Sequence, residues 1–142
     1  MTDERMRGFV RAFCGAWLSR DRERVAEWLA DDVDWLVFGP VGLFPFFQRH
    51  GKAAVLAMLR AIDAGLEIGG CDPDSTLIDG PRAAALIKLT VVDKPTGRTL
   101  SLRLAMFAEV RSGKITRLRA VFDTFDAAEQ ALGREIDLSA VA

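Results

Sequence analysis

Few side chains in this chain could carry out acid–base or nucleophilic chemistry. Its 142 residues include one histidine, His50, two cysteines, Cys14 and Cys71, and no tyrosine. Histidine is the residue type that ordinarily titrates near neutral pH, whereas histidine clusters, Cys/His zinc sites and tyrosine acids need residues that this sequence lacks. The two cysteines form neither a disulfide framework nor a metal-binding pattern, so we expect reduced thiols, no metal and no cofactor.

Three side chains remain as weak candidates for catalysis: His50, Asp34 and Asp123. His50 stands just before a predicted helix and is the leading candidate for a general base, although a histidine in a solvated loop is the simpler interpretation. Asp34 alternates with apolar neighbours, so its side chain is expected to point away from the interior. Asp123 lies near the end of the last predicted strand, where an ion pair with Arg103 is favoured over catalysis.

Composition is typical of an ordinary globular protein, and the two reduced thiols are those expected of a protein of the cytoplasm. Hydrophobic residues make up 50% and charged residues 27% of the sequence, and the formal net charge is -1. A protein that binds nucleic acid usually carries a basic surplus, and no apolar run reaches the ~20 residues that span a bilayer. We therefore expect neither nucleic acid nor a membrane as a partner.

The elements that position these side chains follow from apolar periodicity and turn residues, within one predicted domain over residues 1–142. Helical spacing of apolar residues predicts helices over 3–19, 21–30 and 51–64, with a short final helix over 126–132. Alternation predicts strands over 33–38, 70–78, 83–92, 98–110 and 114–125. Helices first and strands later indicate an α+β fold with the helices on one face of an antiparallel sheet.

The register of the last three strands can be predicted from their alternation. A three-residue loop that pairs Arg111 with Ile115, with Gly113 near the left-handed conformation, places Glu109 opposite Arg117. The pairs that follow across the three strands are Ala108 with Leu118, Met106 with Ala120, Leu104 with Phe122, Arg103 with Asp123, Val91 with Leu100, Leu89 with Leu102, Ile87 with Leu104 and Lys88 with Arg103.

This register gives the sheet two different faces. The apolar face, which must pack against the helices, consists of Ile87, Leu89, Val91, Leu102, Leu104, Met106, Leu118, Ala120 and Phe122. The opposite face carries Lys88, Ser101, Arg103, Glu109, Arg117, Arg119 and Asp123, with Phe107 and Val121 among them. We expect this charged face to meet solvent or a second subunit.

Several short motifs carry a family resemblance: Leu29-Ala30-Asp31-Asp32, Gly39-Pro40-Val41-Gly42, Pro95-Thr96-Gly97-Arg98 and Gly113-Lys114-Ile115-Thr116. Together with the order of elements, they resemble the nuclear-transport-factor-2-like superfamily, which includes ketosteroid isomerases, SnoaL-like polyketide cyclases and limonene epoxide hydrolases. Residues 95–138 are most similar to the limonene epoxide hydrolases. The resemblance implies a cone: three N-terminal helices packed on a strongly curved, mostly antiparallel sheet, with a short C-terminal helix, an interior pocket and often a homodimer through the outer sheet face.

The resemblance also indicates where catalytic residues would stand, and apolar residues or glycine occupy those positions. The ketosteroid isomerase set matches Phe13, Gly39 (or Val37) and Met106. The limonene epoxide hydrolase set matches Leu89, Val91, Ala120, Trp35 and Val37. None of these side chains can transfer a proton, so we expect both activities to be absent.

What remains is an apolar pocket, expected to bind a small hydrophobic molecule such as a terpenoid, steroid, polyketide or fatty acid. Its predicted lining is Phe13, Trp17, Trp35, Val37, Phe47, Leu89, Val91, Leu104, Met106, Leu118, Ala120 and Phe122. Two alternatives stay open. One is an isomerase, cyclase or hydrolase with a rewired site; the other is a partner-binding dimer. Phe44, Phe46 and Phe47 could form a lid, a core plug or an interface.

Overall fold

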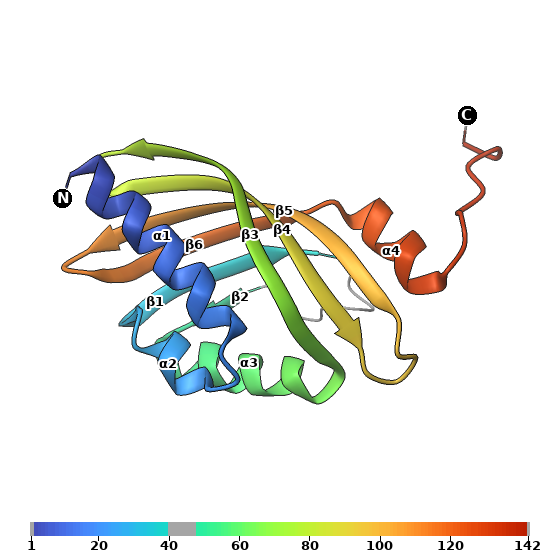
Figure 1. Ribbon diagram of the computed structural model, residues 1–142, viewed down its shortest axis with the longest axis horizontal. Helices are drawn as coiled ribbons and strands as arrows, with labels where there is room; N and C mark the ends of the chain where they lie inside the picture. The colour runs from blue at the N-terminus through green and yellow to red at the C-terminus, as the bar shows by residue number, and fades with distance from the viewer. Residues whose placement is uncertain (1, 40–47, 142) are drawn as a thin grey trace.

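The computed structural model describes residues 2–39 and 48–141, and within them the chain is a mixed α+β structure (Figure 1). Its helices are α1 (Asp3–Leu18), α2 (Arg22–Ala26), α3 (Lys52–Gly65) and α4 (Thr124–Leu132). Its strands are β1 (Leu29–Phe38), β2 (Gln48–His50), β3 (Leu66–Asp79), β4 (Arg82–Asp93), β5 (Thr99–Arg111) and β6 (Lys114–Phe122). The predicted fold class, three helices packed on a curved, mostly antiparallel sheet with a short C-terminal helix, is confirmed.

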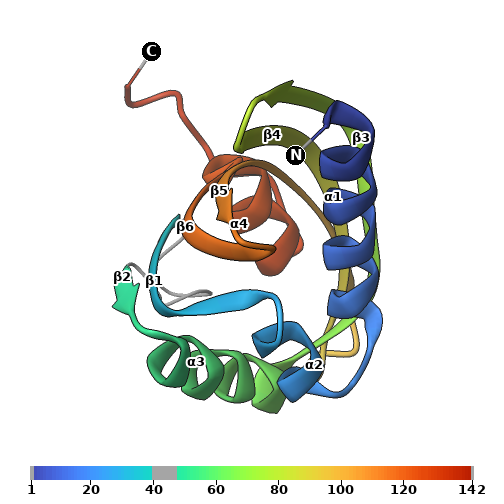
Figure 2. The same cartoon turned by 90° about the vertical axis from the view of Figure 1, so that its left-hand side faces the viewer.

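The six strands form one open sheet in the order β2-β1-β6-β5-β4-β3. The pairing of β1 with β6 is parallel and the other pairings are antiparallel. Figure 2 shows the sheet curling strongly, and α3 contacts both β1 and β2 at one end of the order and β3 at the other. The helix therefore bridges the two ends of the curved sheet, and the concave face encloses the core.

Helix α1 is amphipathic and packs against β3. The side chain of Thr2 caps its first turn by accepting from the backbone N–H of Arg5. Met6, Val10 and Phe13 recur at helical spacing and are buried, which fixes the face that the helix presents to the sheet.

The predicted register of the long strands is confirmed. The observed pairs include Val91 with Leu100, Leu89 with Leu102, Ile87 with Leu104, Lys88 with Arg103, Leu104 with Phe122, Met106 with Ala120, Ala108 with Leu118 and Glu109 with Arg117. A slip of one residue would have moved every apolar side chain to the other face, which explains why alternation was sufficient to find the pairing.

The turn between β5 and β6 differs from the expected three-residue loop. Arg111 pairs with Lys114 rather than with the residue that follows it. The turn is therefore Ser112-Gly113, with φ of 50° and 72°. Two successive positive φ values are typical of a type I′ turn, whose twist matches that of the strands. The extra residue is Thr116, where the register shifts and whose hydroxyl donates to a backbone carbonyl of β5 at 3.2 Å.

Several element boundaries also correct the sequence prediction. The second helix ends at Ala26 instead of residue 30, and β1 begins at Leu29 because the N–H of Ile115 at the start of β6 bonds the carbonyl of Trp28. The third strand begins at Leu66 directly after α3. The short strand β2 was not predicted, since three residues with two exposed side chains give no periodic signal.

The last predicted strand ends earlier than expected because Asp123 caps a helix. Its carboxylate accepts from the N–H of Asp126, and α4 starts at Thr124. Helix α4 also completes the hydrogen bonding of β5: the side-chain amide of Gln130 bonds both the N–H and the carbonyl of Ser101, at 2.7 and 2.8 Å. No helix within residues 2–39 and 48–141 is long and apolar enough to cross a membrane.

Candidate functional site

The concave face of the sheet and helices α1 and α3 line a partly open cavity of about 90 Å³. Inward alternation along β1, β4, β5 and β6 supplies most of its wall, because every second side chain of a strand points to the same face. The described residues that line it are Cys14, Trp17, Trp35, Val37, Met58, Ile62, Leu66, Ile68, Cys71, Ile87, Leu89, Val91, Leu104, Met106, Leu118, Ala120 and Phe122. This lining contains no carboxylate, imidazole, ammonium or guanidinium group.

Ten of the side chains predicted for the pocket lie on this wall: Trp17, Trp35, Val37, Leu89, Val91, Leu104, Met106, Leu118, Ala120 and Phe122. Phe13 is buried next to it and meets the ring of Trp17 edge-on at 6.1 Å. Phe47, together with Phe44 and Phe46, falls outside the described residues. Sequence reasoning missed the lining side chains of β3, Ile87 of β4 and three from the helices, Cys14, Met58 and Ile62.

Two tryptophan rings and one buried cation form the part of the wall nearest α1. The rings of Trp17 and Trp35 are 6.1 Å apart. The guanidinium of Arg22 lies 5.6 Å from the Trp17 ring, donates to the Trp17 carbonyl at 3.3 Å and forms two bonds to the Asp63 carboxylate at 2.7 and 2.5 Å. Arg22 is only 8% exposed, so this pair ties α2 to α3 and holds Trp17 at the cavity.

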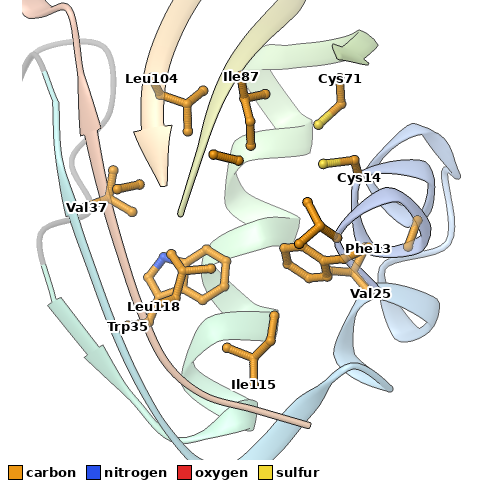
Figure 3. Close-up of a cluster of buried hydrophobic side chains, with 14 of the residues drawn as sticks. Phe13, Cys14, Val25, Trp35, Val37, Cys71, Ile87, Leu104, Ile115 and Leu118 are labelled. Carbon is orange, nitrogen blue, oxygen red and sulfur yellow. The ribbon is translucent and has the colours of Figure 1, made fainter. Parts of the chain in front are cut away.

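Two thiols face each other on the same wall. Figure 3 shows the sulfur atoms of Cys14 from α1 and Cys71 from β3 pointing toward one another. Both cysteines are free and buried. The hydrogen bond from Cys71 lowers the pKa of the Cys14 thiol, while the same contact and burial raise the pKa of Cys71. They are the only ionisable side chains among the described residues that line the cavity.

One polar atom of the wall lacks a partner. The indole Nε1 of Trp35 is buried, with the residue 3% exposed, and it has no hydrogen-bond acceptor within the described parts of the chain. Figure 3 shows this nitrogen on the ring edge nearest Val37, another lining residue. Buried N–H groups are rarely left without an acceptor, so an unpaired Nε1 at this position is unusual for a folded protein.

The three candidate catalytic residues lie away from the cavity. The carboxylate of Asp34 accepts a hydrogen bond from Arg119 at 2.7 Å, which lowers the pKa of Asp34, and Arg117 and His50 act in the same direction. Asp34 therefore stays ionised and is a weak base. His50 is exposed on β2, where it is paired with Asp34. Neither side chain is part of the cavity lining.

Asp123 also has a different role from the ion pair expected with Arg103. Its side chain caps α4, and only its backbone N–H meets Arg103, by donating to that residue's carbonyl at 3.0 Å. The expected ion pair is wrong because a helix start follows the strand at once, and the capping carboxylate satisfies a free N–H there. Asp123 is exposed, on the far side of the sheet from the cavity.

The curved, unclosed sheet and its four helices define a conical α+β fold of the nuclear-transport-factor-2-like class. The family model of the SnoaL-like domain matches residues 10–118, so the chain belongs to the SnoaL-like domain family. No curated protein sequence matches it significantly.

Solved structures agree with this assignment. A protein from Rhodopseudomonas palustris described as a candidate isomerase is 38% identical, with a TM-score of 0.80 over 94% of this chain and 100% of its own. An NTF2-like protein from Burkholderia pseudomallei is 24% identical, with a TM-score of 0.76 over 93% and 97% of the two chains. An LEH-like epoxide hydrolase from M. tuberculosis is 22% identical, with a TM-score of 0.73 over 88% and 87%.

Proposed function

We propose that this protein binds a small hydrophobic molecule in the cavity between the sheet and helices α1 and α3. The observation that carries the proposal is the wall itself: every described lining residue is aliphatic, aromatic or sulfur-containing. An apolar space with no charged group among its described lining residues favours an apolar occupant. A well-packed core would leave no such space.

The volume sets the size of the ligand. Pockets for drug-sized ligands are roughly 300–1,000 Å³, and an apolar cavity of about 150 Å³ accommodates benzene. The cavity here is about 90 Å³. Steroid and polyketide skeletons exceed this space, so the proposed ligand is a molecule slightly smaller than benzene, or a fragment of that size on a longer chain.

Filling the cavity from within is expected to remove binding and to stabilise the fold. Ala120 is 3% exposed and lines the cavity, and Ala120→Leu adds an isopropyl group that occupies it. We expect the free energy of unfolding to rise by about 1 kcal/mol, as cavity filling commonly gives. The probe is 2-methyl-1-butene, and NMR of the protein's methyl groups follows its binding. The methyl signals should shift to saturation as the probe is added to the wild type, and should not shift in the variant.

Ala85→Leu is the matched control for this experiment. Ala85 is also a buried alanine of the sheet, 6% exposed, but it does not line the cavity. The added group has no space, so we expect a loss of about 2 kcal/mol and unchanged probe binding in the folded protein. Wild-type methyl groups of Leu118 and Met106 that do not respond to the probe would refute the proposed function.

An isomerase of a small hydrophobic substrate is the second candidate, favoured by the 38% identity to the R. palustris protein described in those terms. The cavity wall offers only the thiols of Cys14 and Cys71 as acid or base among its described residues. Deuterium exchange at the carbon next to the carbonyl of butanone distinguishes the two functions. Binding alone gives no catalysed exchange, whereas exchange that disappears in Cys14→Ser would favour the isomerase.

We also propose that the ketosteroid isomerase and limonene epoxide hydrolase activities are absent. The positions that match those catalytic sets hold Phe13, Val37, Leu89, Val91, Met106, Ala120 and Trp35, or Gly39. Support comes from their chemistry, since none of these groups can accept or release a proton at neutral pH. Measured turnover of either substrate class at rates comparable to those of the family enzymes would contradict this proposal.

A homodimer through the outer sheet face is a further part of the proposed function. Leu86, Phe107 and Val121 lie on three adjacent strands and are 55%, 52% and 46% exposed. The register places Ala84 and Ala105 between them, so the apolar side chains form one patch on β4, β5 and β6. A contiguous exposed patch of this kind marks an interaction surface, and a second copy presents the same patch.

Phe107→Asp is expected to convert the dimer to a monomer at micromolar concentration, because the patch would then bury an unpaired charge. Leu18→Asp is the control, since Leu18 is 46% exposed at the end of α1, far from the outer sheet face. Sedimentation equilibrium measures both. A wild-type monomer at micromolar concentration, or an equal effect of the two substitutions, would count against the dimer.

A further inference from the structure

The Trp35 indole is the one described polar group of the cavity wall that is both buried and without a partner. Its Nε1 has no acceptor among residues 2–39 and 48–141, and the residue is 3% exposed. An unmade hydrogen bond on a buried donor destabilises the folded protein. The ring edge that carries this N–H lies nearest Val37 (Figure 3), and both residues line the cavity.

The surroundings restrict what could satisfy this donor. The remaining described wall consists of carbon atoms and the sulfurs of Met58, Met106, Cys14 and Cys71, which are weak acceptors. The Trp17 ring packs 6.1 Å from that of Trp35 and helps to hold the indole in place. The described residues therefore offer this donor no oxygen acceptor, and an oxygen atom of a bound ligand that reached Nε1 would supply one.

We propose that the ligand carries one hydrogen-bond acceptor oxygen, a carbonyl or an ether, which accepts from Nε1–H of Trp35. This inference rests on the proposed binding function and names the chemical class of the ligand. A carboxylate or phosphate is disfavoured because no cation among the described lining residues would compensate for its burial. An alcohol is a poorer fit, since its own O–H would meet only thioethers and thiols.

The contact also has a chemical consequence. A donor directed at a carbonyl oxygen polarises that group and stabilises negative charge that develops on it. Trp35 would thus orient a ketone or ester in the cavity without transferring a proton, because an indole N–H donates but does not ionise at neutral pH. The other lining residues would discriminate between ligands by their shape alone.

Two probes of equal shape test the proposal: butanone, and the methylbutene in which a methylene group replaces the carbonyl oxygen. Both are one heavy atom smaller than benzene. The alkene is less well hydrated than the ketone, so the two affinities differ for reasons unrelated to Trp35. The informative quantity is therefore the ratio of the butanone affinity to the methylbutene affinity, and how a mutation changes this ratio. In Trp35→Phe the ratio should shift against butanone by about tenfold, the effect of about 1.4 kcal/mol from one hydrogen bond.

The wild-type protein supplies a second measurement that needs no mutation. The chain has three tryptophans, so its heteronuclear NMR spectrum contains three indole N–H signals. The Trp35 signal, assigned from its loss in Trp35→Phe, should move on addition of butanone and respond far less to methylbutene. Trp28→Phe is the matched control: Trp28 packs on Phe9 at 5.0 Å and does not line the cavity, so the affinity ratio should stay unchanged.

The outcomes separate this inference from the function on which it rests. If both probes bind and the affinity ratio is the same in wild type and Trp35→Phe, the cavity binds ligands but Trp35 donates no hydrogen bond to them. The inference is then wrong. If neither probe binds the wild type, the binding function itself fails and the inference falls with it. A tenfold shift confined to Trp35→Phe supports both.

Discussion

Leu118→Ala is expected to lower the free energy of unfolding by about 3 kcal/mol and to let benzene into the protein. Leu118 is 1% exposed, lines the cavity and is paired with Trp35 across β1 and β6. Removing its isopropyl group costs the transfer free energy of the lost atoms and the free energy of a larger void. The space then grows from about 90 Å³ toward the ~150 Å³ in which benzene fits.

Calorimetric or denaturant unfolding measures the first effect, and the rise in Tm with added benzene measures the second. Saturation at a hundred times Kd raises stability by about 2.7 kcal/mol, which recovers most of the loss. Ile115→Ala is the control, since Ile115 is fully buried on the same strand but does not line the cavity. It should cost a similar amount and gain no benzene binding. Equal benzene responses in the two variants would show that the cavity has no special role.

The second large effect concerns the buried pair of Arg22 and Asp63. Asp63→Ala leaves the guanidinium of Arg22, which is 8% exposed, without its carboxylate partner. Breaking a buried ion pair from one side usually costs roughly 3–5 kcal/mol, and the partial exposure of Asp63 places the expected loss at about 3 kcal/mol. Arg22→Met should cost less, because the remaining carboxylate can be hydrated.

The same two helices carry an exposed pair that serves as the control. Arg60 of α3 bonds Glu23 of α2, and both side chains are 62% exposed. Glu23→Ala should change the free energy of unfolding by no more than about 0.5 kcal/mol. Urea unfolding of the three variants checks the order Asp63→Ala, Arg22→Met, Glu23→Ala. If Glu23→Ala lowered the free energy of unfolding as much as Asp63→Ala does, burial of the Arg22–Asp63 pair could not explain the effect of Asp63→Ala.

The fold could be predicted from the sequence where alternation was strong. In β4, β5 and β6 one face is apolar and the other charged, so only one register was consistent, and the structure has it. The turn after Arg111 was misjudged because a serine with positive φ is uncommon, while the sheet twist favours the two-residue turn that requires it. At this position the backbone preference of serine for negative φ opposes the turn type that the twist of β5 and β6 favours.

The site was harder to predict than the fold for a physical reason. Alternation identifies side chains that point inward, but it does not distinguish a core residue from one beside an empty space, since both are apolar. Arg22 and Asp63 are 41 residues apart, and no local pattern links them. The missing partner of Trp35 Nε1 depends on where every neighbouring acceptor lies, which only the three-dimensional structure shows.

The open sheet also determines how copies of this protein can associate. Its outermost strands are β2, which has three residues, and β3, which contains Pro73 and two shifts in register. A very short strand and an irregular one with a proline are both poor templates for adding a strand from another molecule. Edge-to-edge growth into aggregates is thereby disfavoured.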